Sequence, residues 1–139
     1  MNYANEIDSL IQGVFLAIGK PIPREKYEIL DRGLPHTQPT RLPFGKMAVY
    51  MFLFNSEFLK IGKANHRSNA RFCSHHYSLS APSMLAKSLL ADDEMISFNI
   101  TPSNVKDWIK TNCRRIDIIM DADLGVFALD LIEGIMHYK

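Results

Sequence analysis

Two apolar segments on either side of a polar tip constrain the fold of this chain most strongly. Residues 47–54 and 58–61 are rich in aromatic and β-branched side chains, and Asn55 and Ser56 lie between them. This pattern predicts a β-hairpin. Gly62 ends the second strand, and a polar stretch follows it.

The register of this hairpin decides which side chains share a face, because side chains alternate across a strand. A loop with an odd number of residues pairs Tyr50 with Lys60, whereas a two-residue turn at Asn55 and Ser56 pairs Tyr50 with Ile61. No glycine stands at the tip to favour the tight primed turn, so we expect the odd loop. Tyr50 and Lys60 would then lie directly opposite each other.

Hydrophobic periodicity predicts the other elements of an α+β chain. We expect an amphipathic helix over residues 4–19, further helices over 67–77, 80–91 and 101–112, and a third strand over 114–120 that joins the hairpin. Asp121 is expected to cap a last helix. The core stripe of that helix is expected to be Leu124, Phe127, Leu131 and Ile135, widened by Val126 and Ile132. The predicted fold is a small three-stranded antiparallel sheet flanked by helices, with an added N-terminal helix.

Residues 20–46 form a long connection with five prolines, two glycines and six basic residues. We expect one short helical turn there, near residues 24–30, and basic side chains that either bind a nucleic-acid backbone or stay solvated. The chain then divides into residues 1–45, a helix and basic connection, and residues 46–139, the main part of one compact domain. The 4–19 helix is expected to pack on the core, with a homodimer through this helix as the alternative.

From the hairpin onward the chain resembles the GIY-YIG nuclease superfamily. Residues 48–50 (Ala-Val-Tyr) correspond to the Gly-Ile-Tyr motif on the first strand, and residues 60–62 (Lys-Ile-Gly) to the Tyr-Ile-Gly motif on the second. Arg71 corresponds to the arginine of the next helix, and Glu133 to the metal-binding glutamate of a late helix. Lys60 replaces a catalytic tyrosine, as in some restriction-type members. The resemblance extends from residue 46 to the C-terminus.

This resemblance implies a metal-dependent endonuclease that hydrolyses phosphodiester bonds in DNA. Tyr50 would act as the base, with Lys60 lowering its pKa, and Arg71 would bind the scissile phosphate. Glu133 would hold one Mg²⁺ or Mn²⁺ against the leaving oxygen. The expected catalytic residues are therefore Tyr50, Lys60, Arg71 and Glu133, and we expect them to converge on one concave face. Substrate binding is expected from Lys63, Arg67 and His75, where His75 or His76 matches a histidine that often follows the family arginine.

Charge distribution is compatible with a phosphate-binding face. Residues 47–91 contain five basic side chains and one acidic side chain, whereas residues 92–139 contain nine acidic and five basic ones. A solvated helix face is the alternative explanation, and Glu133 alone would be taken for a surface residue. The second functional hypothesis is an inactive nuclease-derived module that binds nucleic acid or blocks a partner. We favour the enzyme, because an inactive copy has no reason to keep Tyr50, Arg71 and Glu133 together.

The sequence also argues against a membrane or secreted protein. No apolar run approaches the roughly 20 residues that a membrane span requires. The first residues lack the basic-then-apolar pattern of a secretory signal. Cys73 and Cys113 have no zinc-binding spacing, and we expect two buried thiols, with a disulfide as the alternative. We therefore expect a cytoplasmic protein.

Overall fold

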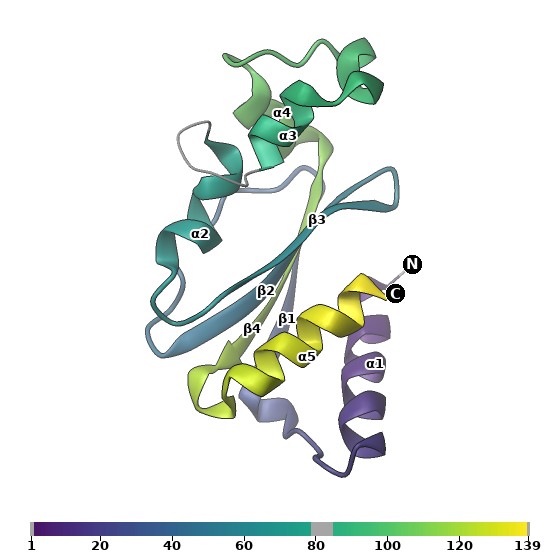
Figure 1. The fold of residues 1–139 in the computed structure, drawn as a ribbon, viewed down its shortest axis with the longest axis vertical. Coiled ribbons are helices and arrows are strands. Elements are labelled where there is room, and N and C mark those ends of the chain that lie inside the picture. The colour runs from purple at the N-terminus through teal and green to yellow at the C-terminus, as the bar shows by residue number, and fades with distance from the viewer. Residues whose placement is uncertain (1, 79–84, 139) are drawn as a thin grey trace.

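The computed structural model describes residues 2–78 and 85–138. At its centre lies a four-stranded antiparallel sheet in the order β1-β4-β2-β3 (Figure 1). The strands are β1 (Tyr27–Gly33), β2 (Lys46–Phe54), β3 (Glu57–Ala64) and β4 (Arg114–Asp121). The α+β class is confirmed, as is the pairing of the strand over 114–120 with the hairpin.

The prediction of three strands is wrong, because part of the proline-rich connection forms β1 and pairs with β4. The prolines nearest to this segment, Pro23 and Pro35, lie outside the strand, so they remove no hydrogen bond from the sheet. The helical turn expected near residues 24–30 is limited to the 3₁₀ turn η1 (Arg24–Lys26). Residues 1–45 therefore supply a helix and a strand to the same sheet and core as the rest of the chain.

The hairpin tip is a two-residue turn. Asn55 and Ser56 have φ values of 51° and 66°, and both therefore adopt the left-handed conformation of a type I′ turn. Asparagine tolerates this conformation better than most residues, which explains why a turn without glycine still forms here. The expected odd loop is therefore wrong.

One extra residue, Leu59, bulges from β3 just beyond the tip. The bulge shifts the register by one residue, so that Phe52 faces Lys60 and Tyr50 faces Gly62. The expected direct pairing of Tyr50 with Lys60 is wrong. Because residues two apart on β2 share a face, Lys60 still lies on the sheet face of Tyr50.

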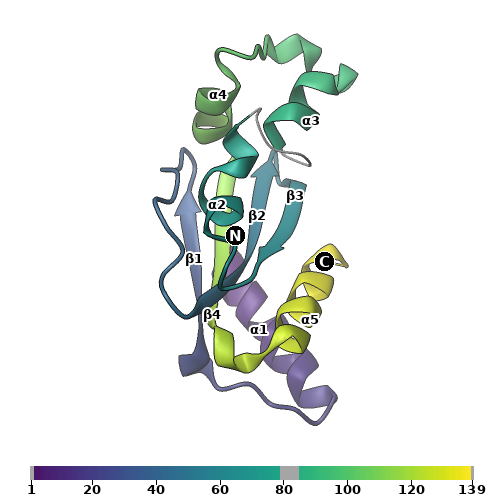
Figure 2. The same ribbon diagram turned by 60° about the vertical axis from the view of Figure 1, so that its left-hand side comes forward.

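Two helical layers cover the two faces of the sheet (Figure 2). On one face, α1 (Tyr3–Ala17) and α5 (Val126–His137) pack against the odd-numbered side chains of β2. The core packing expected for the N-terminal helix is confirmed, since Ile7, Ile11 and Phe15 are buried there. Pairing of this helix with a second copy of the chain stays a prediction.

Short helices pack on the other face, which carries Tyr50, and beyond one end of the sheet (Figure 1). These are α2 (Asn69–Cys73), α3 (Leu85–Ala91) and α4 (Val105–Asn112), with the 3₁₀ segments η2 (His75–Tyr77) and η3 (Asp93–Phe98). The helix expected over 67–77 is interrupted at Ser74, where the chain changes to η2. Residues 80–84 of the helix expected over 80–91 lie outside the described residues. Cys73 and Cys113 are both buried free thiols.

The last helix differs from its prediction in its start and in its buried face. Asp121 ends β4 rather than capping the helix, and α5 begins after η4 (Ala122–Leu124) and Gly125. The fully buried side chains are Ala128, Leu129, Ile132 and Met136. Leu124, Leu131 and Ile135 of the expected stripe are partly buried against the same core, whereas Phe127 is 59% exposed. Apolar residues occur at helical spacing on both faces of this segment, so their pattern alone could not select the face that packs. No helix in the described part of the chain is long and apolar enough to cross a membrane.

Candidate active site

Tyr50, a residue of β2, lies at the centre of the candidate site, and its ring leans over the edge strand β3. Its side chain is 0% exposed, and its ring covers Gly62, the residue opposite it in the hairpin. A Cβ atom at position 62 would stand 2.5 Å from the Tyr50 hydroxyl oxygen and 2.6 Å from Cζ. Such contacts are too short for any side chain, so glycine at position 62 is what makes room for the phenol.

His76, in η2, binds the hydroxyl group of Tyr50. Its Nε2 atom lies 2.7 Å from Tyr50 Oη, and its Nδ1 accepts the backbone N–H of Leu85 at 3.2 Å. Because Nδ1 accepts, a neutral ring carries its proton on Nε2 and donates it to Tyr50. Burial, followed by the positive charge of Lys60, lowers the pKa of His76 to about 3. His76 is therefore a neutral donor to the phenol oxygen at physiological pH.

Charges around Tyr50 partly oppose the effect of its burial. Burial raises the pKa of Tyr50, and the positive charge of Arg71, then that of Arg115, lowers it. Glu133 has the smallest of these effects and raises the pKa. Arg71 is thus the cation that acts most strongly on the phenol, a role that the sequence prediction gave to Lys60.

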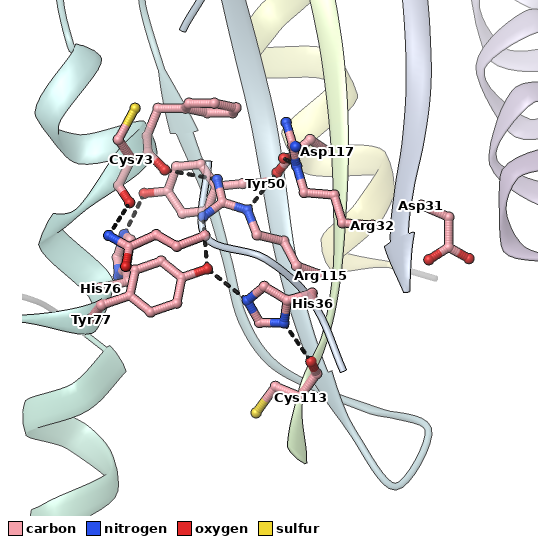
Figure 3. Close-up of polar contacts among 12 residues, drawn as sticks. Asp31, Arg32, His36, Tyr50, Cys73, His76, Tyr77, Cys113, Arg115 and Asp117 are labelled. Carbon is pink, nitrogen blue, oxygen red and sulfur yellow. Dashed lines mark hydrogen bonds and ion pairs between the residues drawn. The ribbon is translucent and has the colours of Figure 1, made fainter. Parts of the chain in front are cut away.

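Arg115, a buried arginine of β4, links the segments that form the site. Arg115 is 0% exposed, and its guanidinium donates to Asp117 Oδ1 at 2.9 Å, to the Phe72 carbonyl at 2.7 Å and to Tyr77 Oη at 3.3 Å (Figure 3). The rings of Tyr50 and Phe72 lie 5.6 and 4.8 Å from its central carbon. Phe72 follows Arg71 in α2, and Tyr77 follows His76 in η2. Arg115 therefore ties both of these segments to β4.

The network continues away from Tyr50 through further buried groups. Tyr77 donates its hydroxyl proton to His36 Nε2 at 2.7 Å, and His36 Nδ1 donates to the Cys113 carbonyl at 2.6 Å. Arg32, from β1, donates to the second oxygen of Asp117 (Figure 3). Buried side-chain nitrogen and oxygen atoms of the described residues all have hydrogen-bond partners, so the network is complete within itself.

Glu133 approaches the site from the other helical layer. It belongs to α5, which packs on the face opposite to Tyr50, and it lies beside Lys63 of the edge strand β3. Lys63 Nζ is 2.5 Å from Asp130 Oδ1 and 3.8 Å from Glu133 Oε1. The structure thus places Tyr50 and Lys60 on one face of the sheet and the helix of Glu133 on the other, at the edge formed by β3. The expected convergence of the four catalytic residues on one face is therefore wrong for Glu133. Glu133 and Tyr50 remain close enough for their charges to interact.

Two expected substrate-binding residues lie outside the predicted helical face. Arg67 is exposed in the turn before α2, where its backbone N–H donates to Asn65 Oδ1 at 2.9 Å. His75 is half-buried in η2, beyond the break in the helix. A continuous helix over 67–77 would have placed Arg67, Arg71 and His75, at spacings of four, on one face. This alignment does not form, because α2 has only five residues.

Divalent-cation binding at Glu133 fits the chemistry of this carboxylate. Its side chain is 23% exposed, and the 3.8 Å distance to Lys63 is too long for a direct hydrogen bond. Mg²⁺ keeps several of its waters and is commonly bound through one or two carboxylates. The described residues contain no group of three or more His, Cys, Asp or Glu side chains suited to a metal. A site here would therefore depend on one carboxylate together with substrate oxygens.

Comparisons with known proteins add no family assignment. No protein-family model matches the chain, and neither the curated proteins nor the solved structures contain a match. The resemblance of residues 46–139 to the GIY-YIG superfamily accordingly stays a prediction from motifs.

Proposed function

We propose that this chain is a metal-dependent endonuclease of the GIY-YIG type that hydrolyses phosphodiester bonds in DNA. The observation that carries the proposal is the setting of Tyr50. Its phenol is packed over Gly62, accepts a hydrogen bond from the N–H of neutral His76, and is influenced by Arg71 more than by any other cation. A phenol held by a neutral donor beside a cation is suited to proton transfer, because both neighbours stabilise the phenolate.

Each residue has a proposed role in this chemistry. Tyr50 takes a proton from the attacking water, and the His76 N–H and the charge of Arg71 stabilise the resulting phenolate. Arg71, which is exposed, binds the scissile phosphate bidentately and stabilises its developing charge. Lys60 adds positive charge on the same face of the sheet. Further phosphate contacts come from Lys63, Arg67 and His75.

Glu133 holds the Mg²⁺ or Mn²⁺ ion in this proposal. The ion, when bound, would supply charge stabilisation at the leaving oxygen. The charge of Glu133 supports this role, since it acts on Tyr50 from the neighbouring edge of the sheet and raises the pKa of the phenol.

An inactive binding module is the second candidate, and the burial of Tyr50 favours it. A phenol that is 0% exposed and has a raised pKa must become accessible to water before it can act as a base. In this alternative Arg71, Arg67 and Lys60 bind nucleic acid or a partner, and Tyr50 and His76 serve only to pack η2 against the sheet.

Plasmid cleavage separates the two candidates. Supercoiled plasmid is incubated with the protein and Mg²⁺ or Mn²⁺, with EDTA as the control. The enzyme is expected to nick or linearise it in a metal-dependent manner. Glu133→Ala should abolish cleavage and leave DNA affinity nearly intact, whereas Arg71→Ala should weaken both. Plasmid that stays supercoiled with either metal, while the protein binds it, would decide for the binding module.

A further inference from the structure

Lys63 lies between two carboxylates on α5 that are three residues apart and share a helix face. Its ammonium nitrogen is 2.5 Å from Asp130 Oδ1 but 3.8 Å from Glu133 Oε1. The first distance is a direct, charge-assisted hydrogen bond, and the second is an ion pair without one. One cation is therefore shared unequally between two acceptors.

This unequal sharing has a structural basis. The side chains of Lys63 and Asp130 are 41% and 50% exposed, whereas that of Glu133 is 23% exposed. The hydrogen bond to Asp130 is the main cause that raises the pKa of Lys63, and burial, followed by the smaller effect of the Arg71 charge, opposes it. Lys63 thus stays protonated while Asp130 holds it at the outer edge of the site. Glu133, the deeper carboxylate, keeps its oxygens free of a direct lysine contact.

We propose that Asp130 is a positioning residue that holds Lys63 away from Glu133 and so keeps this carboxylate open to a divalent cation. The proposal rests on the metal role of Glu133 in the proposed function, and it adds two residues that regulate access to that carboxylate. Without Asp130, the acceptor left to the Lys63 ammonium is Glu133, and an ammonium in direct contact competes with the metal for the same oxygens.

The effects on cation binding should have opposite signs for the two residues. Asp130→Asn keeps the size of the side chain but removes its charge, and it should weaken Mn²⁺ binding about two- to fivefold, the range set by one partly exposed ion pair. Lys63→Met should strengthen binding by a similar factor. The double variant should bind Mn²⁺ as well as Lys63→Met does, because Asp130 acts only through Lys63.

Two measurements test the proposal. Paramagnetic broadening of backbone amide signals around Glu133 is followed by NMR during a Mn²⁺ titration of the folded protein, with Glu133→Gln as the variant that should lose it. Asp123→Asn is the matched control, because Asp123 is another exposed carboxylate bonded to a lysine, Lys26, at 2.9 Å. A metal-free crystal structure of Asp130→Asn should show Lys63 Nζ in direct contact with Glu133.

Each result bears on a different claim. A Lys63 side chain that does not move toward Glu133 in Asp130→Asn overturns the positioning role, as does unchanged Mn²⁺ binding in that variant. Absence of broadening at Glu133 in the unmodified protein also overturns it. Failure of plasmid cleavage, with Mn²⁺ bound at Glu133 and the variants behaving as expected, rejects only the nuclease function.

Discussion

Replacing Gly62 with alanine should destabilise the protein strongly, because the new methyl group would occupy space now filled by Tyr50. The added Cβ would stand 2.5, 2.6 and 2.8 Å from three atoms of the phenol, whereas ordinary contacts lie at 3.4–4 Å. The ring must therefore shift by roughly 1 Å, which strains the core by about 1–3 kcal/mol. The shift also breaks the hydrogen bond to His76, adding about 1 kcal/mol or more.

In urea titrations, Gly62→Ala should lower the free energy of unfolding by about 2–4 kcal/mol. The urea concentration at the midpoint of unfolding should fall by about 1 M or more. Gly134→Ala is the matched control, because a Cβ at this helical position meets nothing within 4 Å. That substitution should stabilise α5 by about 0.5–1 kcal/mol. Adding Gly62→Ala to Tyr50→Ala should cost little, since the clash is then absent. If Gly62→Ala lowers the free energy of unfolding equally in the parent and in the Tyr50→Ala variant, the packing argument is refuted.

Three further predictions concern His76, the hairpin tip and the pH dependence of cleavage. Because the pKa of His76 falls from 6.5 to about 3 on folding, the unfolded chain binds the extra proton, and stability is lost as the pH falls below 6.5. When the pH is lowered from about 7.5 to 5, the unfolding free energy of the parent should fall by roughly 2 kcal/mol more than that of His76→Gln. Equal losses in the two proteins would contradict the low pKa of His76. Ser56→Gly should raise the free energy of unfolding by roughly 0.5–1 kcal/mol in urea titrations, because glycine adopts the φ of 66° at that position without strain. A decrease in this free energy would contradict the type I′ turn. Because burial raises the pKa of Tyr50 above 10, single-turnover cleavage should accelerate about tenfold per pH unit up to about pH 9, whereas a plateau near neutral pH would indicate another base.

Sequence patterns predicted the elements that depend on local periodicity. The hairpin, the N-terminal helix and the strand over 114–120 all carry strong apolar signals, and all three form. The hairpin register could not be predicted, because it depends on a bulge at Leu59 that has no signal in the sequence. β1 was missed because the prolines on both sides of it suggested a loop, although they lie outside the strand.

The candidate site was predicted less completely, since it depends on contacts between distant segments. His76 was weighed only as an alternative to His75, because its contact with Tyr50 arises where α2 ends and η2 begins. Arg115 and Asp117 lie in a strand whose other residues suggested an apolar core. Their pairing, two residues apart on one strand face, is a sequence signal that could have indicated a buried ion pair.

Cleavage by Tyr50→Phe compared with the parent protein tests the central claim most directly. The substitution removes one oxygen and leaves the ring over Gly62, so circular dichroism and DNA affinity should change little. In single-turnover reactions with supercoiled plasmid and Mg²⁺, the parent should cleave and the variant should be at least about 100-fold slower, as expected for loss of a general base. A parent protein that binds the plasmid without cutting it, or a variant that cuts within about threefold of the parent rate, would contradict the account.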